Sequence, residues 1–210
     1  PYAFGPIVAE FLYHAFGAHG YFLAGTVPAL IGLPLLWTIR PADKAEGPIG
    51  GILDLVATPR VWLPLTAGIV YGYMFGFISA YAAPILVERG VIVGAFFTAF
   101  TISIFAVRFG GLALIENVDR RLVVAGGSVL LAVGLVMVAL AQTMTGVAAA
   151  GLVFGLGHSI GFPVLSAWIC DGTPPEQRAT PMAVFNATFF AAMTAIALPT
   201  SVAIGRFGYE

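Results

Sequence analysis

The chain has 210 residues, of which 60% are hydrophobic and 9% are charged, and its formal net charge is −1. Since soluble domains carry about 25% charged residues, this composition excludes a soluble fold, and the near-neutral charge offers no nucleic-acid-binding face. The mean hydropathy of +0.98 indicates a protein that lives in lipid, where only helices and closed barrels satisfy the backbone. Continuous apolar runs of about 20 residues without strict alternation predict helices.

Seven apolar stretches are predicted to cross the bilayer, the first of them cut short. The first, residues 1–16, is interpreted as the second half of a helix, because it has neither an initiator Met nor the charged region of a signal peptide. The second covers residues 21–39. Five more follow, at 61–87, 94–114, 122–142, 147–170 and 181–204. The predicted fold class is therefore all-α, a polytopic transmembrane helix bundle.

The most polar stretch of the chain, residues 40–60, separates two groups of spans and is predicted to be a linker and domain boundary. Loops on one side of the membrane carry six Lys and Arg residues, and the opposite loops carry two. This bias predicts that the 40–60 linker and the 115–121 and 171–180 loops are cytoplasmic. The predicted location is the plasma (inner) membrane, as a multi-pass protein. No single loop clusters enough Lys or Arg to predict recognition of a particular lipid.

Glycine and proline recur inside the predicted spans. Small residues at every fourth position let helix backbones approach closely, and proline is expected to kink a helix. The alternative is that both residues are simply common in membrane helices. The glycine stripes are Gly68, Gly72 and Gly76, then Gly151 and Gly155, then Gly157 and Gly161, and the prolines inside spans are Pro28, Pro34, Pro84, Pro163 and Pro199.

Ionisable residues inside a membrane are expensive, so each is a functional candidate. His158 lies in the middle of its span, and since the ordinary pKa of histidine is near working pH, it could accept a proton or bind a polar solute. The alternative is a histidine that packs against a neighbouring helix. Glu10 is either a carboxylate that takes up protons or one that reaches water at the helix end. Arg108, near a helix end, is expected to pair with Glu116, Asp119 or backbone carbonyls.

Several other chemistries lack the residues they need. The single cysteine, Cys170, excludes a disulfide within the chain and a cysteine-based metal site. The histidines are not spaced with carboxylates as zinc ligands. The only lysine, Lys44, lies in a loop, which excludes a retinal Schiff base in a span. No phosphate-binding Gly-Lys-Ser/Thr motif is present, and no cofactor or enzymatic activity is predicted.

Three motifs, in order along the chain, resemble the major facilitator superfamily of secondary transporters. Gly5-Pro6 is similar to the core of the helix-5 motif of facilitator antiporters, although Ala9-Glu10 departs from its glycines. The loop at 111–121 resembles the acidic-then-basic loop between helices 8 and 9, with Glu116 as the acid and Arg120 and Arg121 as the basic pair. Residues 155–186 resemble helices 10 and 11 of efflux-permease-like facilitators.

On this resemblance the chain covers the middle of helix 5 to the end of helix 11. Residues 1–39 would end the N-terminal half, 40–60 would be the cytoplasmic linker, and 61–210 would form the C-terminal half without helix 12. The expectation is a fragment, whose missing helices belong to the same polypeptide.

The resemblance implies a secondary active transporter that moves a small solute by alternating access, with proton coupling and efflux. The alternative is a non-transporting seven-helix membrane protein, either a receptor or a scaffold. Helices 7, 8, 10 and 11 would line the cavity, and the aromatic content suits a moderately hydrophobic or sugar-like solute. The expected substrate-binding residues are Tyr71, Phe75, His158, Phe162 and Asn186. The candidates for proton coupling are Glu10 and His158, and those for conformational gating are Arg108, Glu116, Asp119, Arg120 and Arg121.

Overall fold

The computed structural model describes residues 5–38, 55–111, 115 and 117–207. Over these residues the secondary structure is helical, with no strand. The chain divides into two compact units, Pro1–Gly47 and Pro48–Glu210. The prediction of an all-α membrane helix bundle is confirmed.

Six helical segments of the described residues are long and apolar enough to cross a membrane. Five correspond to the predicted spans of the second unit, with ends that differ by at most six residues. The sixth, Phe11–Pro34, lies where the sequence predicts two separate spans. The other five are Pro59–Glu88, Val93–Gly111, Arg120–Leu140, Met144–Trp168 and Pro175–Arg206.

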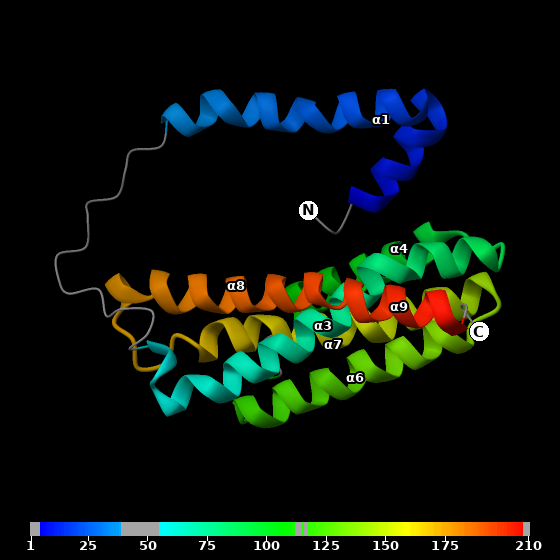
Figure 1. The fold of residues 1–210 in the computed structure, drawn as a ribbon. Helices are drawn as coiled ribbons and strands as arrows, with labels where there is room; N and C mark the ends of the chain where they lie inside the picture. The colour runs from blue at the N-terminus through cyan, green and yellow to red at the C-terminus, as the bar shows by residue number, and fades with distance from the viewer. Residues whose placement is uncertain (1–4, 39–54, 112–114, 116, 208–210) are drawn as a thin grey trace. The chain divides into compact units, whose positions relative to one another are not determined.

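The first unit contains one long element, α1 (Gly5–Thr38), which is bent at Gly17 (Figure 1). Gly17 has φ of 65° and ψ of −175°, a backbone conformation that only glycine adopts without strain. The bend falls between the first two predicted apolar stretches. Large apolar side chains such as Phe11 and Phe22 are exposed along α1, as expected of a helix whose surface meets lipid.

The second unit is a bundle in which α7 (Met144–Trp168) packs against α6 (Arg120–Leu140) and α4 (Val93–Ala106). Helix α3 (Pro59–Glu88) packs mainly against α8 (Ala179–Ala195). The long helices run side by side along the bundle (Figure 1). The remaining elements are a π-helical turn at Val107–Gly111, a short 3-10 helix at Pro175–Gln177, and α9 (Ala197–Phe207).

The glycine stripes mark the close contacts between these helices, as predicted. A β-carbon on Gly72 would overlap the Phe189 carbonyl of α8, and one on Gly151 would overlap the Phe96 carbonyl of α4. A β-carbon on Gly157 would lie 2.6 Å from the Gly127 carbonyl oxygen of α6. Each stripe therefore holds a different pair of helices at backbone contact, which a larger side chain would prevent.

The last predicted span, 181–204, is divided into α8 and α9 at Ile196. Pro199 explains the division, because a proline cannot donate to the carbonyl four residues earlier and its ring clashes there. That carbonyl belongs to Ala195, the last residue of α8. The kink predicted at this proline is thus seen as a break between two helices.

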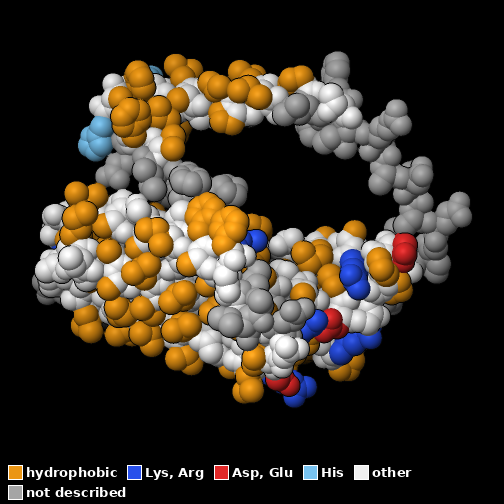
Figure 2. Space-filling view, turned by 180° about the vertical axis from the view of Figure 1, so that it is seen from behind, with side chains coloured by type: hydrophobic (Ala, Val, Ile, Leu, Met, Phe, Trp, Pro, Cys, Tyr) orange, Lys and Arg blue, Asp and Glu red, His pale blue; other side chains and the backbone are white. Residues whose placement is uncertain are grey.

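Polar and apolar surfaces are separated along the second unit. Figure 2 shows apolar side chains over most of its face, with charged side chains gathered mainly toward one end. That end carries the first residues of α3 and α6 and the loop after α7, which contain Arg60, Arg120, Arg121, Asp171 and Arg178. At the other end Arg89 donates to the carbonyl oxygens of Val138 (3.0 Å) and Ala141 (3.1 Å), which satisfies acceptors at the C-terminus of α6.

Candidate functional site

His158 lies in the middle of α7 and is surrounded by aromatic rings from three helices. Its ring centroid is 4.9 Å from that of Phe75 on α3 and 5.2 Å from that of Phe162 on α7, with interplanar angles of 28° and 24°. The Phe100 ring of α4 lies 5.7 Å away at 41°. The imidazole is therefore stacked against two phenyl rings and flanked by a third.

The close approach of α4 to α7 explains why Phe100 reaches His158. A β-carbon on Gly155 would lie 2.8 Å from the Phe100 carbonyl oxygen, so only a glycine allows this separation. The hydroxyl of Ser103 donates to the Leu152 carbonyl oxygen across the same contact, at 2.8 Å. The backbone contact thus fixes the position of the α4 ring that flanks the imidazole.

A second group of rings extends the cluster around His158. Phe154 lies 6.4 Å from Phe75 and 6.2 Å from Phe100, and Phe189 of α8 lies 5.1 Å from Phe162. Phe154 and Phe189 are almost completely buried. The cluster is therefore an apolar region that contains one polar ring, and it joins α3, α4, α7 and α8.

The Nδ1 atom of His158 is buried and has no hydrogen-bond partner among the described residues. A buried polar atom without a partner costs about 1–3 kcal/mol, so such atoms are rare and call for an explanation. One explanation is that Nδ1 accepts a proton or binds a ligand, because the proton or the ligand then provides the missing partner during function. Apart from this histidine, the cluster offers only aromatic faces and edges.

Two other predicted solute-binding residues lie near the cluster but in different surroundings. Tyr71 is completely buried one turn before Phe75, and its hydroxyl donates to the Val124 carbonyl oxygen of α6 at 3.2 Å. Asn186 is partly buried on α8, next in sequence to Phe185, whose ring lies 5.7 Å from that of Phe162. In this conformation the Tyr71 hydroxyl therefore ties α3 to α6.

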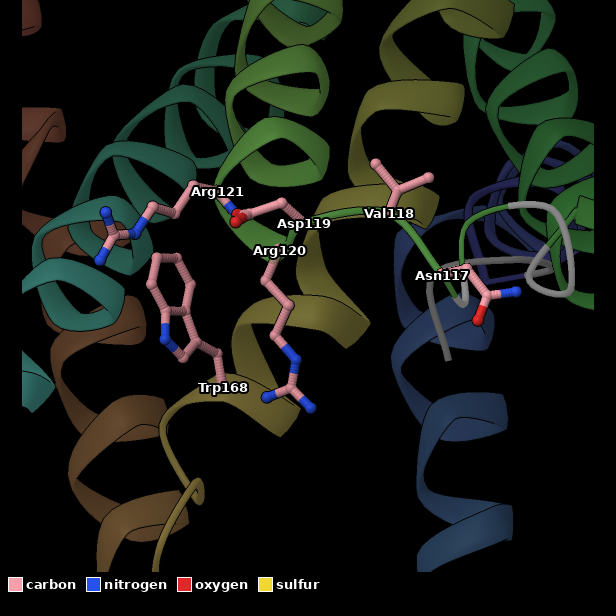
Figure 3. A pocket seen from close by; sticks show the side chains of 6 residues that line it. All are labelled: Asn117, Val118, Asp119, Arg120, Arg121 and Trp168. Atoms are coloured by element: carbon pink, nitrogen blue, oxygen red, sulfur yellow. The ribbon is translucent and has the colours of Figure 1, made fainter.

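A second polar site lies at the charged end of the bundle, where α6 begins. The Asp119 side chain caps α6 by accepting from the Arg121 backbone N–H at 2.7 Å. Arg120 forms an ion pair with Asp171, in the loop after α7. A cavity of about 400 Å³ is lined here by residues 117–121 and Trp168, and Figure 3 shows the Trp168 ring between the side chains of Arg120 and Arg121.

Of the remaining predicted residues, Arg108 is the one whose side chain the structure describes. Arg108 is exposed in the π-helical turn after α4, and the Asp119 carboxylate, one of its expected partners, caps α6 instead. Glu116 and the side chain of Glu10 lie outside the described residues. Within the described part of the chain, no group of three or more His, Cys, Asp or Glu side chains could hold a metal ion.

Sequence reasoning missed two features of these sites. The first is Phe100, which lies on α4 four residues after Phe96; this helical spacing was the available signal, but it does not indicate a contact with α7. The second is the ion pair between Arg120 and Asp171, which are 51 residues apart. Nothing in the local sequence joins these two loops.

The family model of the Major Facilitator Superfamily matches residues 2–198. The chain belongs to this superfamily of membrane transporters. Comparisons with curated proteins and with solved structures each gave no match. The facilitator resemblance of the sequence motifs is thereby confirmed, and the chain is a multi-pass membrane protein of a transporter family that moves small solutes.

Proposed function

We propose that this facilitator chain belongs to a secondary active transporter that exports a moderately hydrophobic small solute by alternating access, in exchange for protons. The observation that carries the proposal is the buried, unpartnered Nδ1 of His158 within an aromatic cluster. Aromatic faces bind apolar or aromatic solutes through their large contact area. A single imidazole among them supplies the one group that can both bind a proton and bond to a solute.

The geometry suggests how the cluster responds to a solute or proton. The imidazole is stacked between Phe75 of α3 and Phe162 of α7, and the faces of aromatic rings attract a cation. A proton on His158 would therefore strengthen these contacts, while a solute that bonds to Nδ1 would compete for the same ring. Tyr71 and Asn186 complete the proposed solute-binding set, and Glu10 remains a second candidate for proton coupling.

The ion pair between Arg120 and Asp171 is the proposed gate. It links the first residue of α6 to the loop after α7, and Asp119 holds the start of α6 in place through its cap. Because both ion-pair side chains are about half exposed, the pair is weak enough to open in one conformation and close in another. Arg121, Arg108 and Glu116 belong to the same proposed gating group.

A transport assay on the protein produced from its natural reading frame tests the proposal. Proteoliposomes that contain a pH-sensitive dye are screened with a panel of moderately hydrophobic solutes, and solute-dependent proton movement is measured. His158→Leu is expected to abolish that movement, whereas His19→Leu, the same change at an exposed histidine of α1, should leave it intact. If His158→Leu retains both transport and its pH dependence, the site assignment is wrong.

The direction of solute transport is tested in intact cells and in inside-out vesicles. An exporter lowers the amount of solute that cells accumulate, and it concentrates the same solute inside inverted vesicles when these are acidified internally. Uptake into cells instead, or movement that does not respond to a pH gradient, would contradict efflux and proton coupling respectively.

A further inference from the structure

Four arginines from three separate segments meet at the charged end of the bundle. Arg120 and Arg121 begin α6, and Arg178 follows the loop after α7. Arg120 and Arg178 line one cavity of about 370 Å³. The Arg60 guanidinium at the start of α3 lies beside Gly172 of that loop, where a β-carbon would be 2.6 Å from its Nη1. The fold therefore builds a basic cluster that no single loop contains.

Acidic residues only partly neutralise this cluster. Asp171 pairs with Arg120, and Asp119 is occupied by the backbone cap of α6. Glu176 is exposed in the short helix before Arg178. Among the described residues, the guanidinium groups of Arg121 and Arg60 form no hydrogen bond or ion pair. Positive charge therefore remains available at the α6 end of the cluster for an anionic ligand.

An apolar groove continues from the charged cavity along α6. Its volume is about 480 Å³, and it shares Val118 with the cavity of Arg120 and Arg121. Gly126 opens its floor, since a β-carbon there would meet no atom within 4 Å. The groove is lined by Ile115, Val118, Leu122, Val123, Gly126, Gly127, Val129, Leu130 and Ile160.

The length of this surface matches one leaflet of a bilayer. From Arg120 to Leu130 the helix rises about 15 Å, which is half of the roughly 30 Å hydrocarbon thickness. Trp168 lies at the charged end of the groove, where tryptophan is favoured between lipid headgroups and acyl chains. A charged cavity followed by an apolar groove of this length has the shape and polarity of one phospholipid.

We propose that this surface binds an anionic phospholipid, with its phosphate between Arg120 and Arg121 and an acyl chain in the groove along α6. Arginine pairs with phosphate oxygens through two hydrogen bonds at once, and basic pockets between membrane helices recognise anionic headgroups. The positive-inside prediction would put this end in the cytoplasmic leaflet, where anionic lipids are found. The proposal does not depend on what the protein transports.

Fluorescence quenching by brominated lipid tests the site. The protein from its natural reading frame is made with Trp37→Phe and Trp62→Phe, so that Trp168 alone remains of the three tryptophans in this chain. Any tryptophan elsewhere in the reading frame is replaced as well. It is reconstituted in phosphatidylcholine vesicles that contain brominated phosphatidylglycerol or brominated phosphatidylcholine at equal mole fraction. Trp168 is expected to show a preference of about 25-fold for phosphatidylglycerol, because each of two arginine contacts contributes about fivefold.

Two variants separate the headgroup from the chain. Arg121→Gln should lower the preference for phosphatidylglycerol about fivefold, whereas Arg206→Gln, the same change on α9, should not alter it. Gly126→Leu fills the groove and should weaken quenching by phosphatidylglycerol, whereas Gly205→Leu, at another helical glycine with no atom within 4 Å of a β-carbon, should not. Gly126→Ala provides a milder version if the leucine variant does not fold.

Three results would overturn the assignment. Equal quenching by the two brominated lipids means that the surface does not select an anionic headgroup. Loss of quenching when inorganic phosphate is added, without change in the vesicles, means that the cluster binds a soluble anion rather than a lipid. Wild-type quenching in both Gly126 variants means that the acyl chain does not lie in this groove.

Discussion

Replacing Gly155 with alanine is expected to destabilise the second unit, because this glycine lies where α7 and α4 touch. A β-carbon there would be 2.8 Å from the Phe100 carbonyl oxygen and 2.8 Å from Ser103 Cβ, whereas ordinary van der Waals contact begins at 3.4 Å. One of these neighbours is backbone, so the overlap is relieved only if the helices separate. Overpacking of this kind costs about 1–3 kcal/mol.

Gly126→Ala is the matched control for this change. It is the same substitution in a neighbouring helix, but its β-carbon would meet no atom within 4 Å. Alanine improves helix propensity by about 0.8–1 kcal/mol at either position, so the difference between the two variants isolates the overlap. That difference should lower the melting temperature of Gly155→Ala relative to Gly126→Ala by about 2–4 °C for each kcal/mol.

The cysteine of the chain provides the assay. Cys170 is the only cysteine among the 210 residues and is 8% exposed, so a dye that becomes fluorescent on reaction with thiols reports its exposure as the protein unfolds in detergent. The reasoning is refuted if Gly155→Ala and Gly126→Ala melt at the same temperature. The change should also move Phe100 relative to His158, so proton-coupled transport should fall in Gly155→Ala but not in Gly126→Ala.

Three further predictions concern hydrogen bonding, thiol reactivity and the exposed ion pair. Tyr71→Phe removes a buried hydroxyl that donates to the α6 backbone and should lower the free energy of unfolding by about 1 kcal/mol, whereas Tyr73→Phe, on the exposed side of α3, should change it by less than about 0.5 kcal/mol. Burial raises the pKa of the Cys170 thiol, so alkylation of the folded protein should be slow at neutral pH and should accelerate as the pH rises. Alkylation should also be faster after the protein is unfolded in SDS, and equal rates in the folded and unfolded states would contradict this prediction. A double-mutant cycle of Arg120→Gln and Asp171→Asn should give a coupling free energy below about 1 kcal/mol, because the two side chains are 43% and 52% exposed; a larger value would mean that the pair is shielded from water.

The positions of the spans in the second unit could be predicted because they depend on local composition alone. A run of about 20 apolar residues is enough to identify a membrane helix, and the predicted span at 122–142 differs from α6 by two residues at each end. The bend at Gly17 was not predicted, although its backbone conformation requires a glycine. The division before Pro199 was predicted as a kink, from the backbone limits of proline. In each case the signal and the structure it determines lie within one turn of each other.

The candidate sites could be predicted only in part, because they depend on how the helices pair. The sequence singled out His158, Phe75 and Phe162, and the structure stacks these three rings together. It did not indicate Phe100, whose position depends on the contact between Gly155 and α4. The basic cluster could not be predicted either, because Arg60, Arg120 and Arg178 come from three predicted loops, and each loop alone carries too few charges to indicate a lipid-binding site.

Helix α7 connects these observations, since it touches three helices through its glycines. Gly151 and Gly155 meet the backbone of α4, Gly157 meets that of α6, and Gly161 lies against the Tyr71 side chain of α3. His158 lies between these contacts on the same helix. Because the backbones touch at these positions, the glycines set how closely α7 lies to each neighbour, and any rotation or slide of α7 must occur along these contacts. Any such movement would shift the imidazole relative to Phe75 of α3 and Phe100 of α4. The packing of α7 and the aromatic surroundings of His158 would therefore change together.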